Sequence, residues 1–321
     1  MKIEFQTTTE ITTTYWESYT SSFNQVFEKE YKSDYFKHKY QYTIDDNSYH
    51  VFLTEESSIV GGCTVIPYEY FIDESIVRCG LAVDVFILPE YRTDPLALYR
   101  MYKALKKELI QRGISMVIAV PNDVAYPYWK NVVKWKDVGF LNYYALPVKA
   151  GTVVSKFPFL INPLSFIYSH FMLFLSGFNY SCEKFSKIRI NRQNKVIEKQ
   201  RYTQEHIQIH KDDFYASYRI VNEDGIKTCY LIDFYSISKA CKDAFSLQKA
   251  IKTILATEKI DIIIFVGKLN FFQLLLLKVP FKFEPKHLFF TADILIPENI
   301  NTELIYNIQN WDFGLFNYDV R

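Results

Sequence analysis

The residues with the clearest potential for chemistry lie where an apolar, strand-like segment runs into a helix, at residues 89–97. Free backbone N–H groups and the helix dipole attract phosphates at a helix N-terminus, and Arg92 stands just before this one. Asp94 and Pro95 work against such binding, because Pro95 has no N–H and the Asp94 carboxylate is expected to accept the N–H groups that follow. The junction therefore predicts an anion site with some of its donors already used.

Other arrangements of reactive residues exclude common catalytic and metal sites. His206 and His210 alternate with apolar residues as in a strand, where positions four apart stand roughly 13 Å apart, too far to share a metal. The sequence has no Gly-x-Ser-x-Gly elbow, Walker loop or dinucleotide fingerprint. We therefore expect no metal site and none of these three kinds of enzyme.

The elements that must position the junction recur once along the chain. A strand-like segment with an aspartate comes first, then an amphipathic helix, a buried apolar strand and a last strand. The recurring pieces are residues 81–86 and 230–235, 95–112 and 246–258, 114–120 and 260–266, and 141–148 and 282–290. The three matched strands lie 149, 146 and 141 residues apart, and Asp84 matches Asp233. This predicts a duplication, with one large α/β domain as the alternative.

A chain of 321 residues also exceeds the length at which one core usually stops growing. We expect an N-terminal domain at residues 1–150, a hydrophobic and then basic linker at 151–200, and a C-terminal domain at 201–321. In the linker, residues 157–177 are mostly apolar, but prolines and polar residues interrupt them, and only about 13 residues remain from Leu164 onward, below the ~20 that a membrane span requires. A buried helix wedged between the domains is expected instead.

The expected helix has a polar face, because Ser165, Ser169 and Ser176 fall on one side of it. The next stretch, residues 183–201, has seven basic residues against two acids. A solvated surface is the simpler interpretation. Contact of residues 157–201 with an anionic membrane surface or a polyanionic substrate is the alternative.

The composition is that of a folded protein without a strong electrostatic preference. The net charge is +1, so no global field attracts DNA. The N-terminus lacks the apolar stretch of a secretory signal. An odd number of widely spaced cysteines predicts reduced thiols and a cytoplasmic location. The cysteines are Cys63, Cys79, Cys182, Cys229 and Cys241.

The junction resembles that of the GNAT superfamily of acyl-CoA N-acyltransferases. The GNAT signature is Arg or Gln, two residues, Gly, one residue, then Gly or Ala, and Arg92, Pro95 and Ala97 occupy those positions. Further on, residues 121–125 look like the family's Asn-x-x-Ala helix start and residues 138–140 like its Leu-Gly-Phe. Proline in place of the first glycine is a departure from the family pattern.

The resemblance covers about residues 55–148 and, more weakly, 218–295. It is greatest to two-copy members, which include transferases of surface-polysaccharide synthesis and Fem-type aminoacyl-tRNA-dependent enzymes. It implies an α/β fold of two tandem GNAT-like domains, each a mixed twisted sheet flanked by helices. Residues 236–243 of the second copy lack the glycine-rich junction, so the first copy is expected to hold the donor.

The resemblance implies acetyl-CoA or another acyl-CoA as co-substrate and no metal. Its pantetheine would lie along the backbone of the aspartate-bearing strand, and its pyrophosphate at the junction. If the Asp94-Pro95 pair displaces the pyrophosphate, then Arg92, Thr93 and Leu98 would hold it. The implied cofactor-binding residues are Val85, Phe86, Ile87, Arg92, Thr93, Leu96, Ala97, Leu98 and Asn122.

In this family an amine attacks the thioester, so the site needs a base for the ammonium proton and an acid for the leaving thiolate. Glu69 and Asp84 are the candidate bases, although Glu69 could face solvent and the recurrence of Asp84 favours a structural role. Tyr126 and Tyr128 are the candidate acids. They substitute for the family's tyrosine, whose place falls to Trp129 or Trp135.

The expected function is therefore transfer of an acyl group, in the simplest case acetyl, to an amine on a small molecule or saccharide, such as an amino sugar of a surface polysaccharide. A non-catalytic pseudo-acyltransferase is one alternative, favoured by Asp94-Pro95 and the missing tyrosine. A Fem-type aminoacyl-tRNA-dependent transferase is the other. The sequence leaves the oligomeric state open.

Overall fold

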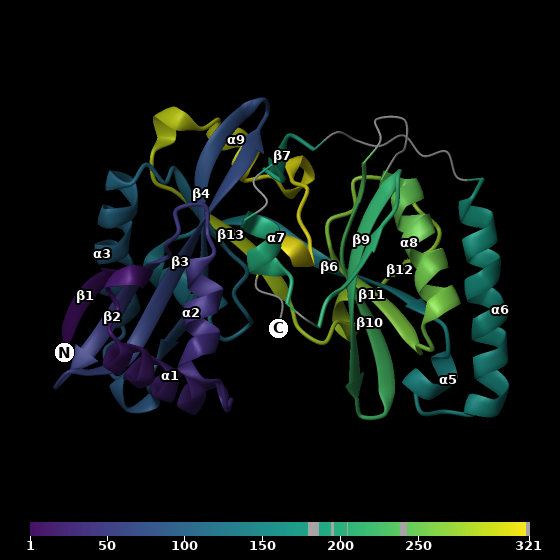
Figure 1. The fold of residues 1–321 in the computed structure, drawn as a ribbon, viewed down its shortest axis with the longest axis horizontal. Helices are drawn as coiled ribbons and strands as arrows, with labels where there is room; N and C mark the ends of the chain where they lie inside the picture. Colours follow the sequence, from purple (N-terminus) through teal and green to yellow (C-terminus); the bar gives the residue numbers. More distant parts are fainter. Residues whose placement is uncertain (179–185, 194–195, 204, 238–242, 319–321) are drawn as a thin grey trace. The chain divides into compact units, whose positions relative to one another are not determined.

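The computed structural model describes residues 1–178, 186–193, 196–203, 205–237 and 243–318 (Figure 1). The chain forms two compact units, and each is assembled from three separate segments. Unit 1 comprises Met1–Phe140, Lys187–Arg201 and Leu288–Asn310, and unit 2 comprises Leu141–Ser186, Tyr202–His287 and Trp311–Arg321. This division differs from the expected contiguous domains 1–150 and 201–321, and the expected linker 151–200 is shared between the units.

Unit 1 is a mixed sheet in the order β1-β2-β3-β4-β5-β13, with β7 beside β3. Neighbouring strands are antiparallel except the parallel pair β4 and β5. The strands are β1 (Lys2–Thr7), β2 (Tyr49–Glu55), β3 (Ser58–Ile72), β4 (Ser75–Ile87), β5 (Met116–Ala119), β7 (Ile188–Ile190) and β13 (Leu288–Ile294).

Helices cover both faces of this sheet (Figure 1). On one face α3 (Ala97–Gln111) packs Met101 and Leu105 into the same apolar cluster as Val51. On the other, Tyr19 of α1 (Thr13–Phe27) lies edge-on to Phe52. The faces differ because side chains alternate along a strand. The remaining helices are α2 (Ser33–Gln41), α4 (Tyr126–Tyr128), α7 (Val196–Arg201), α9 (Thr302–Ile305), the π-helical turn η3 (Trp129–Val133) and the 3₁₀ turns η1 (Thr8–Glu10), η2 (Pro89–Tyr91), η5 (Pro297–Asn299) and η6 (Ile308–Asn310).

Unit 2 repeats the plan with the sheet order β6-β11-β10-β9-β8 and β12 beside β6. Here β10 and β11 form the parallel pair, and α8 (Asp243–Thr257) buries Leu247, Ile251 and Ile254. The other elements are β6 (Lys136–Pro147, whose first five residues belong to unit 1), β8 (Ile207–His210), β9 (Phe214–Glu223), β10 (Ile226–Ser236), β11 (Ile262–Gly267), β12 (Leu277–Lys278), α5 (Ala150–Val153), α6 (Pro158–Ser176), η4 (Phe281–Phe283) and η7 (Leu315–Asn317).

The duplication is confirmed, because β4-α3-β5 in unit 1 and β10-α8-β11 in unit 2 are the same strand-helix-strand arrangement, each with its two strands parallel. The last strand of each copy, however, does not pair with the buried strand of its own copy. In unit 1, β5 pairs with β13, and in unit 2, β11 pairs with β6. The two copies have therefore exchanged their final strands, which is why neither unit is a contiguous stretch of sequence.

Helix α6 is not the buried helix that its composition predicts. Ser165, Ser169 and Ser176 are buried, as their shared face suggests, but the apolar residues around them are largely exposed. Helix α6 is long and apolar enough to cross a membrane. Only 17% of its apolar stretch is buried inside the protein. The expectation was wrong because the hydrophobic pattern identifies which residues share a face but not which face packs inward.

Most of the basic part of the expected linker, Lys187–Arg201, belongs to unit 1. Its strand β7 extends the sheet beside β3, with Arg189 over the ring of Phe71. Lys184 and Lys195 lie outside the described residues, as do Cys182 and Cys241. The three described cysteines, Cys63, Cys79 and Cys229, are buried free thiols.

Candidate active site

The parallel strands β4 and β5 of unit 1 separate halfway along β4. Their pairing runs from Cys79↔Met116 to Leu81↔Ile118 and ends there, whereas β4 continues to Ile87 in pairing with β3. Among the described residues, β4 beyond Leu81 therefore has a strand partner on one side only. Backbone N–H groups that point away from β3 are available to a ligand. In the stretch Val85, Phe86 and Ile87 assigned to the cofactor, the N–H groups alternate between the two sides, so that of Ile87 faces the open side and that of Phe86 faces Gly62 of β3.

A β-bulge lies in this unpaired stretch. The register between β3 and β4 shifts between Gly62 and Thr64, and Asp84 adopts the left-handed conformation with φ of 51°. Bulges bend a strand and redirect its groups, and they are frequent beside active sites. In unit 2 the register of β10 shifts between Leu231 and Asp233, so the recurring aspartate marks an irregular position in both copies.

The Asp84 carboxylate is the end of a buried polar chain. It accepts hydrogen bonds from Lys39 Nζ at 2.7 Å and from the Tyr40 hydroxyl, which lies 3.0 Å from the Tyr19 hydroxyl. Its side chain is 4% exposed and that of Lys39 is 12% exposed. Burial, followed by the charge of Asp84, raises the pKa of Tyr19 and Tyr40 well above their ordinary value. The Asp84 carboxylate is thus hydrogen-bonded within the protein, to Lys39 and Tyr40.

Asp233 of unit 2 has the same kind of partner. Its buried carboxylate accepts a hydrogen bond from the Tyr202 hydroxyl at 3.1 Å. A tyrosine bonded to the bulge aspartate in both copies supports the structural interpretation of Asp84 that its recurrence suggested. Lys39 and Tyr40 were not identified from the sequence, because they lie more than forty residues before Asp84 and carry no spacing signal.

The other candidate base, Glu69, lies far from the bulge along the sheet. It stands opposite Arg78 in the register, six residues of β4 before Asp84, which corresponds to roughly 20 Å at about 3.3 Å per residue. One Glu69 oxygen accepts a hydrogen bond from Asn191 Nδ2 at 2.9 Å. The structure therefore does not bring the two candidate carboxylates together.

A buried histidine on β2 also escaped the sequence interpretation. His50 Nε2 lies 3.0 Å from the Thr8 hydroxyl, and its Nδ1 lies 2.9 Å from the Thr64 hydroxyl. Burial lowers the pKa of His50 from 6.5 to about 3. Its neutral ring is therefore part of the packed interior and is unsuited to gaining a proton during catalysis at neutral pH.

This lowered pKa predicts acid sensitivity. Below pH 6.5 the unfolded chain binds a proton at His50 that the folded chain does not. The free energy of unfolding therefore decreases as the pH is lowered from about 6.5 to 3, by up to about 1.4 kcal/mol per pH unit. In urea unfolding at pH 6.5 and 5, His50→Gln should lose about 2 kcal/mol less than the native chain over that interval. Equal losses in the two proteins would show that His50 is not the titrating group.

The junction between β4 and α3 has the geometry that the sequence predicts. Asp94 Oδ1 accepts the N–H of Leu96 at 3.0 Å, and the Asp94 carbonyl accepts the N–H of Ala97 at 3.2 Å. These two donors are therefore occupied. In the described part of the chain, the N–H groups of Leu98 and Tyr99 donate to no protein acceptor, so the first turn of α3 keeps two donors that could meet a phosphate.

A cation that the sequence interpretation missed compensates the charge at this helix start. The Arg100 guanidinium forms an ion pair with the Asp94 carboxylate. The pair is partly exposed, so its contribution to stability is small. Arg92 Nε donates to the Ile87 carbonyl at 2.8 Å, which ties the loop that includes Thr93 to the end of β4. Asp94 therefore no longer presents an uncompensated negative charge to an incoming phosphate.

The candidate acids lie after β5 and are both accessible. The Tyr126 hydroxyl donates to Asp137 Oδ1 at 2.9 Å and accepts from Lys130 Nζ at 2.8 Å. Tyr128 is exposed. The side chain of Asn122 accepts the N–H of Ala125 at 2.9 Å, which supports the start of the short helix α4. Of the two tyrosines, Tyr126 is the one whose hydroxyl is held in place by hydrogen bonds, to Asp137 and Lys130.

The tryptophans that take the place of the family's tyrosine are core residues. Trp129 and Trp135 are buried, with ring centroids 4.4 Å apart, and both contact the ring of Tyr102. The Tyr102 hydroxyl donates to Asp293 Oδ2 of β13 at 2.8 Å, and Lys106 forms an ion pair with the same carboxylate. The exchanged strand β13 is therefore bonded directly to α3.

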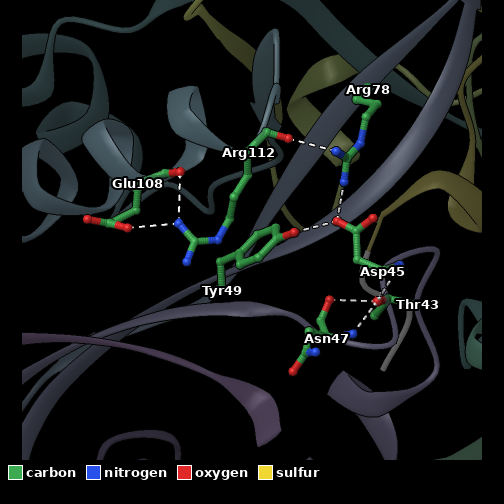
Figure 2. A network of polar contacts seen from close by, with 7 residues as sticks. All are labelled: Thr43, Asp45, Asn47, Tyr49, Arg78, Glu108 and Arg112. Carbon is green, nitrogen blue, oxygen red and sulfur yellow. Dashed lines mark hydrogen bonds and ion pairs between the residues drawn. The ribbon is translucent and has the colours of Figure 1, made fainter. Parts of the chain in front are cut away.

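A polar network fixes the opposite ends of β4 and α3 (Figure 2). Arg78, near the start of β4, donates to the Arg112 carbonyl at 2.7 Å and pairs with Asp45. The Tyr49 hydroxyl also donates to Asp45, and burial followed by this bond raises the pKa of Tyr49 to about 12. Arg112 in turn bonds Glu108 at 2.8 Å. Strand and helix are thereby held in a fixed relation, which places the start of α3 beside the bulged end of β4.

Comparison with known proteins agrees with this arrangement. Residues 7–131 match the family model described as an acetyltransferase (GNAT) domain. No curated protein matches the sequence. Within the described residues, no group of three or more histidine, cysteine, aspartate or glutamate side chains could hold a metal ion.

Solved structures match over most of the chain. A GCN5-related N-acetyltransferase from Anabaena variabilis is 13% identical, with a TM-score of 0.57, over 92% of this chain and 73% of that one. Eis1 from Mycobacterium abscessus is 10% identical, with a TM-score of 0.54, over 93% and 75%. N-myristoyltransferase from Saccharomyces cerevisiae, solved with myristoyl-CoA, is 12% identical, with a TM-score of 0.53, over 90% and 82%. At these identities the likeness shows the fold alone.

The family match and the fold together describe a GNAT-like chain of two units. Residues 7–131 belong to a GNAT acetyltransferase domain, and the fold of the whole chain is that of two-domain structures of this superfamily. Membership of this superfamily implies an acyl-CoA co-substrate.

Proposed function

We propose that unit 1 transfers an acyl group, in the simplest case acetyl, from coenzyme A to an amine. The observation that carries the proposal is the separation of β4 from β5 at the bulge, directly before a helix start with free N–H groups. The pantetheine would pair with the free side of β4. The pyrophosphate would meet the N–H groups of Leu98 and Tyr99, with Arg92 and Arg100 nearby.

In this reaction the amine nitrogen attacks the thioester carbonyl, the C–S bond breaks, and the coenzyme A thiolate takes up a proton. A backbone N–H on the open side of this stretch, at Val85 or Ile87, would stabilise the oxyanion. Tyr126 is proposed as the proton donor to the thiolate, with its hydroxyl turned from Asp137 to the sulfur. Lys130, which bonds both the Tyr126 hydroxyl and Asp137, would stabilise the phenolate that forms and offset the nearby carboxylate.

The ammonium proton is proposed to leave to solvent water. Asp84 is bonded to Lys39 and Tyr40, and Glu69 lies roughly 20 Å from the bulge along the sheet, so neither carboxylate has the position of a base. Asp84 is instead proposed as a positioning residue that holds the bulge. The acceptor is proposed to be an amino group on a small molecule or saccharide, with amino sugars as the first class to try.

The direct test is calorimetric titration of the full chain with acetyl-CoA, followed by release of free coenzyme A with a panel of amines and amino sugars. Binding and amine-dependent release are the expected results. Absence of binding at millimolar acetyl-CoA would refute the proposal. Binding without release for any amine would favour a pseudo-acyltransferase, which the use of the Leu96 N–H by Asp94 also supports.

The ion pair at the helix start gives a matched pair of variants. Asp94→Asn keeps an acceptor for Leu96 but removes the charge and frees Arg100, so acetyl-CoA should bind about tenfold more tightly, as expected for roughly 1.4 kcal/mol of charge-assisted bonding. Arg100→Gln leaves Asp94 uncompensated and should weaken binding by a similar factor. Calorimetric Kd values check both changes, and shifts of the same sign in both variants would contradict the assignment.

A further inference from the structure

Helix α6 of unit 2 is attached to its unit by polar groups in its first half and by a few apolar side chains in its second. The Ser165 hydroxyl accepts the N–H of Ala150 at 2.9 Å and donates to the Val148 carbonyl at 3.0 Å. Asn162 Nδ2 donates to the Thr152 hydroxyl at 2.9 Å. The Ser165 hydroxyl and the Asn162 amide thus bond the side that packs on α5 and the end of β6. Met172 and Leu173 pack on the core of unit 2, and most of the other large apolar side chains point outward.

The outward face is a broad apolar arc. Phe159 is 73% exposed, Leu164 67% and Phe174 64%. The members of the arc that are at least half exposed are Phe159, Leu160, Leu164, Phe166, Ile167, Phe171 and Phe174, flanked by Phe157 and Phe178. With aromatic side chains of about 200 Å² each, these residues present roughly 1,000 Å² of apolar surface, above the 300–600 Å² of the largest patch on a typical monomer.

A second copy of the chain would cover only part of this arc. Leu160, Leu164, Ile167, Phe171 and Phe174 repeat at the four-three spacing of a helix pair. A pair formed on that seam would leave Phe159 and Phe166 on its flank, roughly 100° around the helix. Flanking positions of helix pairs and the rims of interfaces are normally charged or polar, but α6 contains no Asp, Glu, Lys or Arg.

A lipid surface fits an arc without charges better than a protein partner does. Hydrocarbon accepts apolar side chains over the whole width of the arc and requires no complementary polar rim, and in-plane helices bury their apolar face about 5–10 Å into the headgroup and acyl-chain boundary. The exposed Lys156 precedes the helix and could reach lipid phosphates. Crossing the bilayer does not fit, because Ser165 is bonded to the backbone of unit 2 and Met172 and Leu173 pack on its core.

We propose that α6 lies in the plane of a lipid bilayer and holds the protein on the membrane by its phenylalanine and leucine face. Binding rests on apolar burial, so it should occur on uncharged vesicles. The proposal is independent of the acyltransferase assignment, since α6 belongs to unit 2 and the proposed reaction to unit 1.

The test is flotation of the purified full chain with vesicles of phosphatidylcholine, and of phosphatidylcholine mixed with phosphatidylglycerol. The native chain should float with both. Leu164→Glu combined with Phe171→Glu should reduce the partition coefficient at least about tenfold, since each buried apolar side chain contributes roughly 1.5–3 kcal/mol. Both residues are exposed, so urea midpoints should stay unchanged.

The matched control introduces the same two charges at exposed apolar residues outside α6, as Ile76→Glu with Phe283→Glu, and should float like the native chain. A native chain that stays in solution with both vesicles overturns the proposal, and so does equal flotation of all three proteins. Binding to anionic vesicles alone overturns it by pointing to basic residues. A lipid-free dimer that only the α6 variant converts to monomer, without flotation, assigns the arc to a second copy instead.

Discussion

A fragment that ends at residue 150 is expected not to fold, although it contains the whole first copy of the repeat. Unit 1 needs Leu288–Asn310, because β13 pairs with β5. Without β13, the short central strand β5 becomes an open edge, and such edges aggregate. The packing of the fully buried Phe290 would also be lost, and loss of one such side chain alone removes about 3–5 kcal/mol, a large part of a typical domain's stability.

The measurement is urea unfolding followed by circular dichroism. The fragment 1–150 should be insoluble or lack a cooperative transition. Co-expressed with fragment 151–321, it should be recovered as a soluble pair, because the second fragment supplies β13 and the first supplies β6. A fragment 1–150 that unfolds cooperatively by itself would show that the exchange of strands is not required.

The second large effect is expected from Asp84→Asn, with a loss of about 3 kcal/mol in the free energy of unfolding. Asparagine keeps the shape and tolerates the left-handed backbone, and it still accepts the bond from Tyr40. What it removes is the negative charge opposite Lys39, which is only 12% exposed. Removing one partner of a buried pair typically removes 3–5 kcal/mol, because the other charge stays unpaired.

Two comparisons separate this cause from a general effect of substitution. Asp84→Asn combined with Lys39→Met should recover at least half of the loss, since no buried charge is left unpaired. Asp94→Asn, in the more exposed pair with Arg100, should change stability by less than about 1 kcal/mol. Chemical denaturation of the four proteins measures these values. A double variant as unstable as Asp84→Asn alone would show that the lysine charge is not responsible.

The part of the site that the sequence predicted correctly is its backbone framework. Asp84 and Asp233 indicated the duplication, and both lie at register shifts of the equivalent strands. The bond from the Leu96 N–H to Asp94 was also expected and is observed. These features depend on residues close together in the chain, whose types restrict the local backbone directly.

The side chains that complete the site come from distant segments. Lys39 and Tyr40 reach Asp84 from α2, and Asp293 reaches Tyr102 from β13. A single sequence contains no spacing that links such residues. Glu69 and Asp84 illustrate the converse, since both are carboxylates on adjacent strands, yet the register of β3 and β4 keeps them apart.

The sequence by itself determined the strand and helix types, their repetition, and which residues of α6 share a face, because period and residue type act within one element. The tertiary structure decided which last strand completes each sheet, since the ladder bonds of β6 and β13 would suit either buried strand equally well. It also decided that α6 packs by its serine face. The Ser165 hydroxyl bonds to the backbone of Ala150 and Val148 and fixes that face inward, and only the folded chain brings those backbone groups to the helix.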